Sequence, residues 1–404
     1  MRIVIIGAGV AGAIISRHLS SLPGLDVHCL ERVSADDRTH AGTGLNIGPN
    51  GRQALTAFDP PLAAAITAAA FPWRSWRVSL TDGRELFDLP LRTVSRSEGW
   101  RLRWSELYRI LREEAPAIRY DCEIRSVARM DDGSGRTRVA WRDPAGTHTL
   151  DDIDLLIATD GRFSAVREAL SGPPAVTQLG VAIFRTLVAN TSGGLVDDYE
   201  QWFNGPNRLL AFRVPPDHIY IAGTFPIDPG AEIPEAMKTR EALRAAYSPK
   251  NTPPGAQGQW LIDTVCDPAS ALHWARIQET DPAIAEPDAN VLYLGDSSHA
   301  MVPTLGQGAT QAIEGACLAL TIMDRRLAAG DRDVRGWLAE IAQKREGRIH
   351  FVADFSRAAS DTLLPGSDAV ADTLSKTTPA FLARLTELYD GVDPALVPDT
   401  ETHA

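Results

Sequence analysis

The 404-residue sequence contains few cysteines and no long apolar run. Its four cysteines form no CxxC pair, and no histidine stands near them at metal-site spacing. Free thiols in a reducing compartment are therefore expected. Strand-like sequence begins at Ile3, and no run of 18 apolar residues is free of charges and turn signals. These absences predict a cytoplasmic protein without a signal peptide or a membrane span.

An excess of positive charge is also absent. Lysine and arginine number 40 against 52 aspartates and glutamates, which leaves a net charge of −12. Such a balance argues against nucleic acid and against an anionic membrane as partners. The sequence also shows no internal repeat, no Ser-His-Asp set and no metal-ligand cluster. The length suffices for a large buried core, in one large domain or two domains of ordinary size.

The segment 291–316, VLYLGDSSHAMVPTLGQGATQAIEGA, organises the chain. Four apolar residues at 291–294 predict a buried parallel strand that leads directly into Gly295 and Asp296. A carboxylate is thereby placed at the carboxyl end of a strand, where α/β folds bind their ligands. Gly306 and Gly308 follow and open a helical run. The unpaired N–H groups at the start of that helix favour negative charge.

The first residues carry a second ligand signature. A β-branched strand at 2–6 is followed at once by Gly7, Gly9 and Gly12 and then by a helical pattern. In a GxGxxG turn the first glycine permits a tight turn, the second lets a pyrophosphate approach, and the third allows helix–strand packing. Glu31 ends the next strand, about 20 residues later, where an acid accepts hydrogen bonds from a ribose. The alternative is a chance glycine turn.

A second, sheet-rich domain is predicted to begin near Phe71. Two short strand-like runs at 76–80 and 85–89 flank an Asp-Gly pair, a strong hairpin signal, and β-rich runs recur between 171 and 281. A surface excursion of the first domain is the alternative. The sequence is divided into a discontinuous first domain of residues 1–71, 97–170 and 282–345, a second domain of residues 72–96 and 171–281, and a C-terminal helical region of residues 346–404.

Several of these segments together resemble one family, the single-component FAD-dependent aromatic hydroxylases of the p-hydroxybenzoate hydroxylase type. The segment 291–316 resembles their flavin-contacting segment. The segment 154–167, DLLIATDGRFSAVR, resembles their DG motif, whose Asp-Gly turn borders both FAD and the nicotinamide cofactor. The segment 41–55, AGTGLNIGPNGRQAL, with glycines at Gly42, Gly44 and Gly48, resembles their second glycine segment. Arg103, in a predicted helix at 100–111 with Ser105 as its cap, resembles an arginine that reaches the flavin cofactor.

The resemblance implies an α/β fold: a Rossmann-like FAD-binding domain with a parallel sheet, a β-sheet substrate domain and C-terminal helices. The residues expected to bind FAD are Gly7, Gly9, Gly12, Glu31, Arg103, Asp160, Gly161, Gly295, Asp296, Gly306 and Gly308. The catalytic candidates are Tyr220, Asn46, Pro303 and His299. For four of these residues a structural role is the alternative: Asn46 caps a turn, Arg103 is a solvated charge, His299 orients the backbone, and Tyr220 is an aromatic of the core.

The function that the resemblance implies is an FAD-dependent monooxygenase that hydroxylates a hydroxylated aromatic or N-heteroaromatic acid, similar in type to the hydroxypyridine 3-monooxygenases. NAD(P)H would be the co-substrate, and O2 would react through a flavin C4a-hydroperoxide. The expected partners are a small aromatic substrate and O2, and a homodimer is left open. Alternatives are a flavin-dependent reductase, a halogenase, against which the lack of a WxWxIP segment counts, and a non-catalytic FAD-binding redox sensor.

Overall fold

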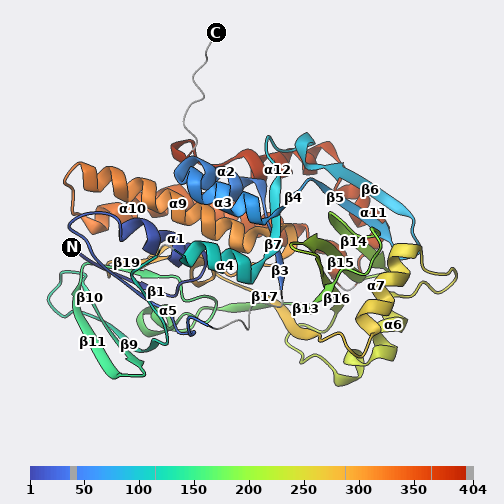
Figure 1. Cartoon of the computed structure of the whole chain (residues 1–404), viewed down its shortest axis with the longest axis horizontal. Helices are drawn as coiled ribbons and strands as arrows, with labels where there is room; N and C mark the ends of the chain where they lie inside the picture. The colour runs from blue at the N-terminus through green and yellow to red at the C-terminus, as the bar shows by residue number, and fades with distance from the viewer. Residues whose placement is uncertain (37–42, 114, 287, 365, 397–404) are drawn as a thin grey trace, which may run out of the picture.

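The computed structural model describes residues 1–36, 43–113, 115–286, 288–364 and 366–396. The first two positions of the predicted second glycine segment, Ala41 and Gly42, therefore lie outside the described residues. Two sheets with different strand arrangements dominate the fold, and helices cover them along one long side of the molecule (Figure 1).

The first sheet has six strands in the order β18-β19-β12-β1-β2-β8. All neighbouring strands are parallel except β18 and β19. The strands are β1 (Arg2–Ile6), β2 (Asp26–Leu30), β8 (Ile118–Arg119), β12 (Leu155–Ala158), β18 (Ala285–Glu286) and β19 (Val291–Tyr293). β12 and β19 are buried throughout, as expected for apolar runs covered on both faces. The parallel sheet predicted from the sequence is confirmed.

Helices cover one face of this sheet, and a small sheet covers the other. The helices are α1 (Val10–Leu19), α2 (Pro49–Phe58), α3 (Pro60–Ala69), α4 (Trp104–Arg112), α9 (Gln307–Ala328) and α10 (Val334–Ala358). Ile3 and Ile5 of β1 pack in the core formed with these helices. Val4 and Ile6 point the other way, toward α5 (Ala165–Ser171) and the antiparallel sheet of β9 (Glu123–Arg129), β10 (Thr137–Asp143) and β11 (Gly146–Ile153).

The second large sheet has seven strands in the order β17-β13-β16-β15-β14-β5-β6. Only β14 and β5 pair in parallel. The strands are β5 (Ser75–Leu80), β6 (Glu85–Pro90), β13 (Val176–Ala189), β14 (Tyr199–Asn204), β15 (Asn207–Val214), β16 (His218–Pro226) and β17 (His273–Thr280). Every one of these strands lies inside the two ranges predicted for the second domain. The predicted hairpin of β5 and β6 is present.

Shorter elements surround and join the two sheets. One face of the seven-stranded sheet packs on α6 (Arg240–Tyr247) and α7 (Ala256–Cys266). A three-stranded sheet, β3 (Gly44–Ile47), β7 (Gly99–Arg103) and β4 (Phe71–Trp73), lies between the two large sheets (Figure 1). The remaining elements are η2 (Leu91–Thr93), η3 (Glu235–Lys238), α8 (Asp296–His299), η4 (Thr304–Gly306), η5 (Asp361–Leu363), α11 (Ala369–Ser375), α12 (Pro379–Asp390) and η6 (Pro394–Leu396).

The predicted helix at 100–111 is wrong in its first part. Residues 99–103 form β7, which pairs antiparallel with both β3 and β4, and the helix begins only at Trp104. Backbone partners on two sides favour a strand there over a helix. Ser105 is not the cap, because the N-cap residue is Arg103 and no side chain caps this end. The helix α7 was not predicted from the sequence.

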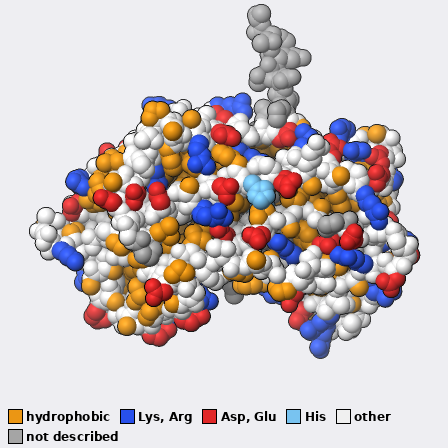
Figure 2. All heavy atoms as spheres, turned by 180° about the vertical axis from the view of Figure 1, so that it is seen from behind, with side chains coloured by type: hydrophobic (Ala, Val, Ile, Leu, Met, Phe, Trp, Pro, Cys, Tyr) orange, Lys and Arg blue, Asp and Glu red, His pale blue; other side chains and the backbone are white. Residues whose placement is uncertain are grey.

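Other features of the described residues bear on function. All four cysteines are free and buried, as predicted. Within the described ranges no helix combines the length and the apolarity needed to cross a membrane, and no cluster of three metal-ligating side chains occurs. Figure 2 shows acidic and basic side chains interspersed over one face of the molecule.

Candidate active site

A cavity of about 720 Å³ extends from the carboxyl end of the parallel sheet to the inner face of the seven-stranded sheet. Its size is that of a site for a sizeable organic ligand. Most residues predicted from the sequence lie on its wall: Gly7, Gly9, Glu31, Asn46, Asp160, Gly161, Tyr220, Gly295, Asp296, Pro303, Gly306 and Gly308. The predicted residues Gly12, Arg103 and His299 are not on this wall.

The glycine turn between β1 and α1 is tightly packed on one side and open on the other. Gly7 has φ +92°, and a Cβ there would lie 2.5 Å from the carbonyl oxygen of Thr159. A Cβ on Gly12 would lie 2.0 Å from the carbonyl oxygen of Gly7. At Gly9, by contrast, a Cβ would meet only the Thr159 carbonyl oxygen, at 3.8 Å. The turn therefore packs against β12 while leaving space for a ligand beside Gly9.

Glu31 is held in place at the end of β2. One carboxylate oxygen accepts a hydrogen bond from the backbone N–H of Ala8 at 2.6 Å, and the other accepts from Val33 at 3.0 Å. Each carboxylate oxygen can accept two hydrogen bonds, so capacity remains toward the cavity. The Arg112 guanidinium lies 3.6 Å from Glu31 and donates to the Ala8 carbonyl oxygen at 2.9 Å.

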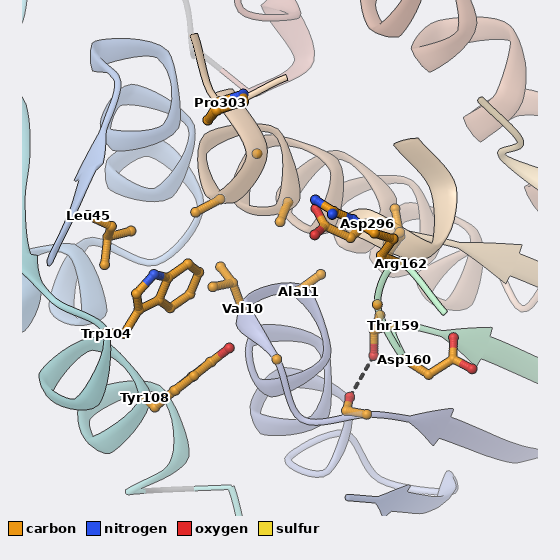
Figure 3. Close-up of a pocket in the computed structure, with 18 of the residues that line it drawn as sticks. Val10, Ala11, Leu45, Trp104, Tyr108, Thr159, Asp160, Arg162, Asp296 and Pro303 are labelled. Carbon is orange, nitrogen blue, oxygen red and sulfur yellow. Dashed lines mark hydrogen bonds between the residues drawn. The ribbon is translucent and has the colours of Figure 1, made fainter. Parts of the chain in front are cut away.

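Sequence reasoning missed the role of helix α4 in this wall. Trp104, Tyr108 and Arg112 all line the cavity. They are spaced four residues apart, so they share one helix face, and Figure 3 shows the first two directed toward the start of α1. That spacing is a signal that the sequence does carry. Burial raises the pKa of Tyr108 to about 12, and the Arg112 guanidinium stacks 4.4 Å from its ring centroid.

Arg103, the arginine expected to reach the cofactor, ends β7 behind the cavity wall. Its Nε is buried and has no hydrogen-bond partner among the described residues. Arg112, nine residues later in the sequence, does line the wall. A contact between Arg103 and a cofactor thus stays a prediction.

Two aspartates that follow different strands of the parallel sheet line the cavity. Asp160 follows β12, and its Oδ2 accepts from the backbone N–H of Val166 at 3.2 Å, while its Oδ1 is buried without a partner in the described residues. Burial raises the pKa of the Asp160 carboxyl. Asp296 follows β19, and the surrounding protein raises its pKa although its side chain is accessible from the cavity. Figure 3 shows Asp296 beside Arg162, whose charge opposes that rise.

The loop before α9 has an unusual backbone. Leu305 and Gly306 have φ values of 66° and 65°, and a Cβ on Gly306 would lie 2.4 Å from Nδ2 of Asn46. A glycine is needed there because the turn is left-handed and because Asn46 approaches so closely. The 22-residue helix α9 then begins at Gln307, and Gly308 in its first turn lines the cavity. The first backbone N–H groups of the helix therefore lie beside the cavity. Such a helix end is a site for negative charge.

The part of the cavity under the seven-stranded sheet is mainly apolar and aromatic. Its wall includes Ile183, Leu210, Phe212, Tyr220, Ala222, Met301 and Pro303. The Tyr220 ring packs 4.9 Å from that of Phe212, and burial raises the pKa of its phenol to about 12. Tyr220 is therefore protonated at neutral pH and can donate a hydrogen bond. Nδ2 of Asn46 has no acceptor among the described residues and is a second available donor.

His299 lies apart from this chemistry. The side chain is 3% exposed, it is absent from the cavity wall, and its Nδ1 has no partner in the described residues. Burial and then the charge of Arg345 lower the pKa of its imidazole to about 3. The geometry therefore gives no support to the prediction of His299 as a base and favours its alternative, a structural role in the turn.

The chain is similar to several known monooxygenases and hydroxylases. No family model matches. The chain is 27% identical over 395 residues to 3-amino-4-hydroxybenzoate 2-monooxygenase of Streptomyces cremeus, covering 92% of this chain and 90% of that protein. It is 27% identical over 365 residues to 2-heptyl-3-hydroxy-4(1H)-quinolone synthase of Pseudomonas aeruginosa, covering 87% of each. The structure of Klebsiella pneumoniae HpxO complexed with FAD and uric acid is similar with a TM-score of 0.75 at 20% identity, covering 98% of this chain and 96% of that one.

Proposed function

We infer that the chain belongs to the single-component FAD-dependent aromatic hydroxylases, the p-hydroxybenzoate hydroxylase family. It is an NAD(P)H-dependent flavoprotein monooxygenase that acts on hydroxylated aromatic or heteroaromatic compounds. The finer proposal is that the substrate is a hydroxylated aromatic or N-heteroaromatic acid. The comparisons leave open which ring is hydroxylated.

The residues of the cavity fit FAD. The open side of Gly9 leaves room for a pyrophosphate, and Glu31 retains acceptor capacity for ribose hydroxyls. The unpartnered Oδ1 of Asp160 and the accessible carboxylate of Asp296 are acceptors for further hydroxyl groups. Donors and acceptors of the right kinds therefore stand along the wall from the glycine turn to the loop before α9.

The loop at 303–308 joins the cofactor part of the cavity to the substrate part. Leu294 and Ala312 pack in the core of the FAD-binding side, whereas Met301 and Leu305 pack with Tyr220 and Phe212. The backbone N–H groups at the start of α9 would face the flavin atoms that gain negative charge on reduction. Bound FAD, once reduced by NAD(P)H, supplies the activation of O2.

The chain's own side chains prepare the substrate. The apolar wall around Phe212 and Met301 excludes water from the reacting ring. Tyr220 keeps its proton on the phenol oxygen and can donate it in a hydrogen bond to the hydroxyl oxygen on the substrate's ring. This hydrogen bond favours the phenolate-like form of the substrate. The second free donor, Nδ2 of Asn46, lies beside Gly306 at the junction of the two parts.

A single observation carries the proposal: one continuous cavity connects the glycine turn to the aromatic pocket. The test is steady-state oxidation of NAD(P)H by the purified yellow protein. We expect oxidation to be stimulated by a hydroxylated aromatic acid and to consume O2 in step with a hydroxylated product. A flavin-dependent reductase would need no O2, a halogenase would need halide, and a redox sensor would show no turnover. Any of these three results contradicts the proposal.

Tyr220→Phe is expected to slow hydroxylation about tenfold or more while leaving FAD bound, because one donor to the substrate oxygen is lost. The measurement is product formed per bound FAD. The matched control is Tyr247→Phe, a buried tyrosine on the opposite face of the same sheet, whose hydroxyl donates to the Thr224 carbonyl oxygen. An unchanged rate in Tyr220→Phe would remove this phenol from the proposed mechanism.

A further inference from the structure

Thr159, which follows β12, packs against all three glycines of the first turn. A Cβ on Gly7 would lie 2.5 Å from the Thr159 carbonyl oxygen, and a Cβ on Gly12 would lie 2.4 Å from the Thr159 Oγ1. On Gly9 a Cβ would meet that carbonyl oxygen at 3.8 Å. Thr159 is 9% exposed and lines the cavity. The turn is therefore shaped by this threonine as well as by its own glycines.

The peptide unit between Gly7 and Ala8 is held from two sides. The Thr159 hydroxyl, whose hydrogen bonding Figure 3 shows as a dashed line, donates to the Gly7 carbonyl oxygen at 2.6 Å. The Ala8 N–H, at the other end of the same peptide unit, donates to Oε2 of Glu31 at 2.6 Å. A trans peptide is planar and directs its C=O and N–H in opposite directions. Because β12 and β2 flank β1 on opposite sides, the two bonds together fix the plane of this peptide unit.

The next peptide unit, between Ala8 and Gly9, is held by helix α4. Nε of Arg112 donates to the Ala8 carbonyl oxygen at 2.9 Å. The same guanidinium lies 3.6 Å from Glu31 and 4.4 Å from the ring centroid of Tyr108, so its own position is fixed by its neighbours. The Gly9 N–H points away from the Ala8 carbonyl oxygen and has no acceptor among the described residues. Gly9 thus offers a free donor on the cavity wall.

These bonds matter because a glycine-rich turn is intrinsically flexible. Two glycines within three residues give the free backbone many conformations, and binding a ligand to such a turn costs the entropy of fixing one of them. Side chains that fix the peptide planes beforehand remove most of that cost. The fold supplies such side chains from β12, β2 and α4, which are far apart in the sequence.

We propose that Thr159 and Arg112 are positioning residues for FAD. They hold two successive peptide units of the glycine turn, so that the Gly9 N–H and the Glu31 carboxylate are oriented for the cofactor before it binds. The inference rests on the proposed function and deepens it, because it assigns the orientation of the turn to two side chains outside the glycine motif.

The first measurement is the dissociation constant of FAD, read from the fluorescence of flavin released when the yellow protein is diluted. Thr159→Ala and Arg112→Gln are each expected to raise this constant about fivefold to tenfold, the effect of one lost hydrogen bond. Thr159→Ser keeps the hydroxyl and loses only a methyl group. It should therefore stay within about twofold of the wild type.

The second measurement separates orientation of the turn from a general structural role. ADP and adenosine are added to the yellow protein, and the concentration of each that releases half of the FAD is compared. In the wild type ADP should act at a concentration at least about tenfold lower than adenosine, because only ADP carries a diphosphate for the turn. This ratio should fall to about threefold or less in Thr159→Ala and in Arg112→Gln. A general loosening of the protein would weaken both probes alike and leave the ratio unchanged.

The control is Arg109→Gln, which removes an arginine on the exposed side of the same helix that pairs with Glu106 and Glu113. It should keep both the FAD affinity and the ratio. A lowered ratio in this control would show that any charge on α4 suffices and would overturn the role of Arg112. Thr159 carries no charge that attracts a phosphate, so a lowered ratio in Thr159→Ala reports the orientation of the turn.

An unchanged ratio in Thr159→Ala, or a Thr159→Ser variant that binds FAD as weakly as Thr159→Ala, would overturn the role of the hydroxyl. If Thr159→Ala does not fold, the ratio in Arg112→Gln decides the proposal. A colourless wild-type protein would instead contradict the assignment of FAD, so the two failures are distinguished before any probe is added.

Discussion

Gly12→Ala is expected to unfold the glycine turn and to eliminate FAD binding. The added methyl would stand 2.0 Å from the Gly7 carbonyl oxygen and 2.4 Å from the Thr159 hydroxyl. Two of the three nearest atoms belong to the backbone of Gly7, which cannot swing aside as a side chain can, so helix α1 would have to move away from the turn. Overpacking of this kind costs about 1–3 kcal/mol and more where the backbone cannot yield. The measurements are urea unfolding and the flavin content of the purified protein.

Gly9→Ala separates binding from folding at the same turn. A methyl there meets only one atom within 4 Å, at 3.8 Å, and Gly9 has an extended backbone that alanine also adopts. This variant should unfold like the wild type and still bind FAD at least about tenfold more weakly, because the methyl occupies space needed by the pyrophosphate. Gly347→Ala, in open space on α10, is the neutral control. Full FAD affinity in Gly9→Ala would contradict the assignment of this turn.

Local sequence predicted several residues that the fold brings together at one cavity. The strand–turn–helix at Gly7 and the strand ends at Asp160 and Asp296 are each contiguous, so hydrophobic pattern and glycine spacing suffice to place them. All of these residues meet at the wall of one cavity. Chain order also predicted the alternation between the parallel sheet and the second sheet, because turn signals mark where each begins.

The substrate part could not be predicted in the same way. Arg208 looks like any polar residue in an alternating strand, and only the fold shows that it lines the cavity. The contact of Arg112 with Glu31, which lies 81 positions earlier in the sequence, appears only in the fold. At residues 99–103 long-range pairing with β3 and β4 overrode a helical pattern. Each failure has the same physical cause: the deciding partner is distant in sequence.

A buried polar network lies behind the loop that precedes α9. Glu314 of α9 is 1% exposed and accepts hydrogen bonds from Arg345 at 2.7 Å and from Arg348 at 3.0 Å. Its other oxygen accepts from Nδ2 of Asn50 at 2.9 Å. Asn50 also donates to Gln307, whose side-chain amide reaches the Leu305 carbonyl oxygen at 3.3 Å. One carboxylate thus connects α10, α2 and the loop before α9.

The charge of Glu314 makes acid stability predictable. Burial alone would raise the pKa of this carboxyl. The pKa is nevertheless lowered to about 2, by the charges of Arg348 and Arg345 and by hydrogen bonds from Arg348 and Asn50. A carboxyl with a lowered folded-state pKa stabilises the protein fully above its unfolded pKa of about 4.3, and that stabilisation is lost as the pH falls through the folded value. The wild type should therefore lose about 3 kcal/mol from this group between about pH 6 and about pH 1.

Glu314→Gln is expected to destabilise the protein by about 3–5 kcal/mol at neutral pH, because two arginines lose their buried counter-charge. The same variant should bind FAD more weakly, since the amide can no longer hold Asn50 and both guanidinium groups together. Urea unfolding at several pH values measures the effect, and the acid-dependent loss assigned to Glu314 should be missing in the variant. Glu340→Gln is the matched control, because Glu340 also bridges α9 and α10 but pairs with half-exposed or exposed arginines. This substitution should cost about 1 kcal/mol of stability or less. Equal losses of stability in the two variants would mean that burial of the Glu314 network does not stabilise the loop before α9.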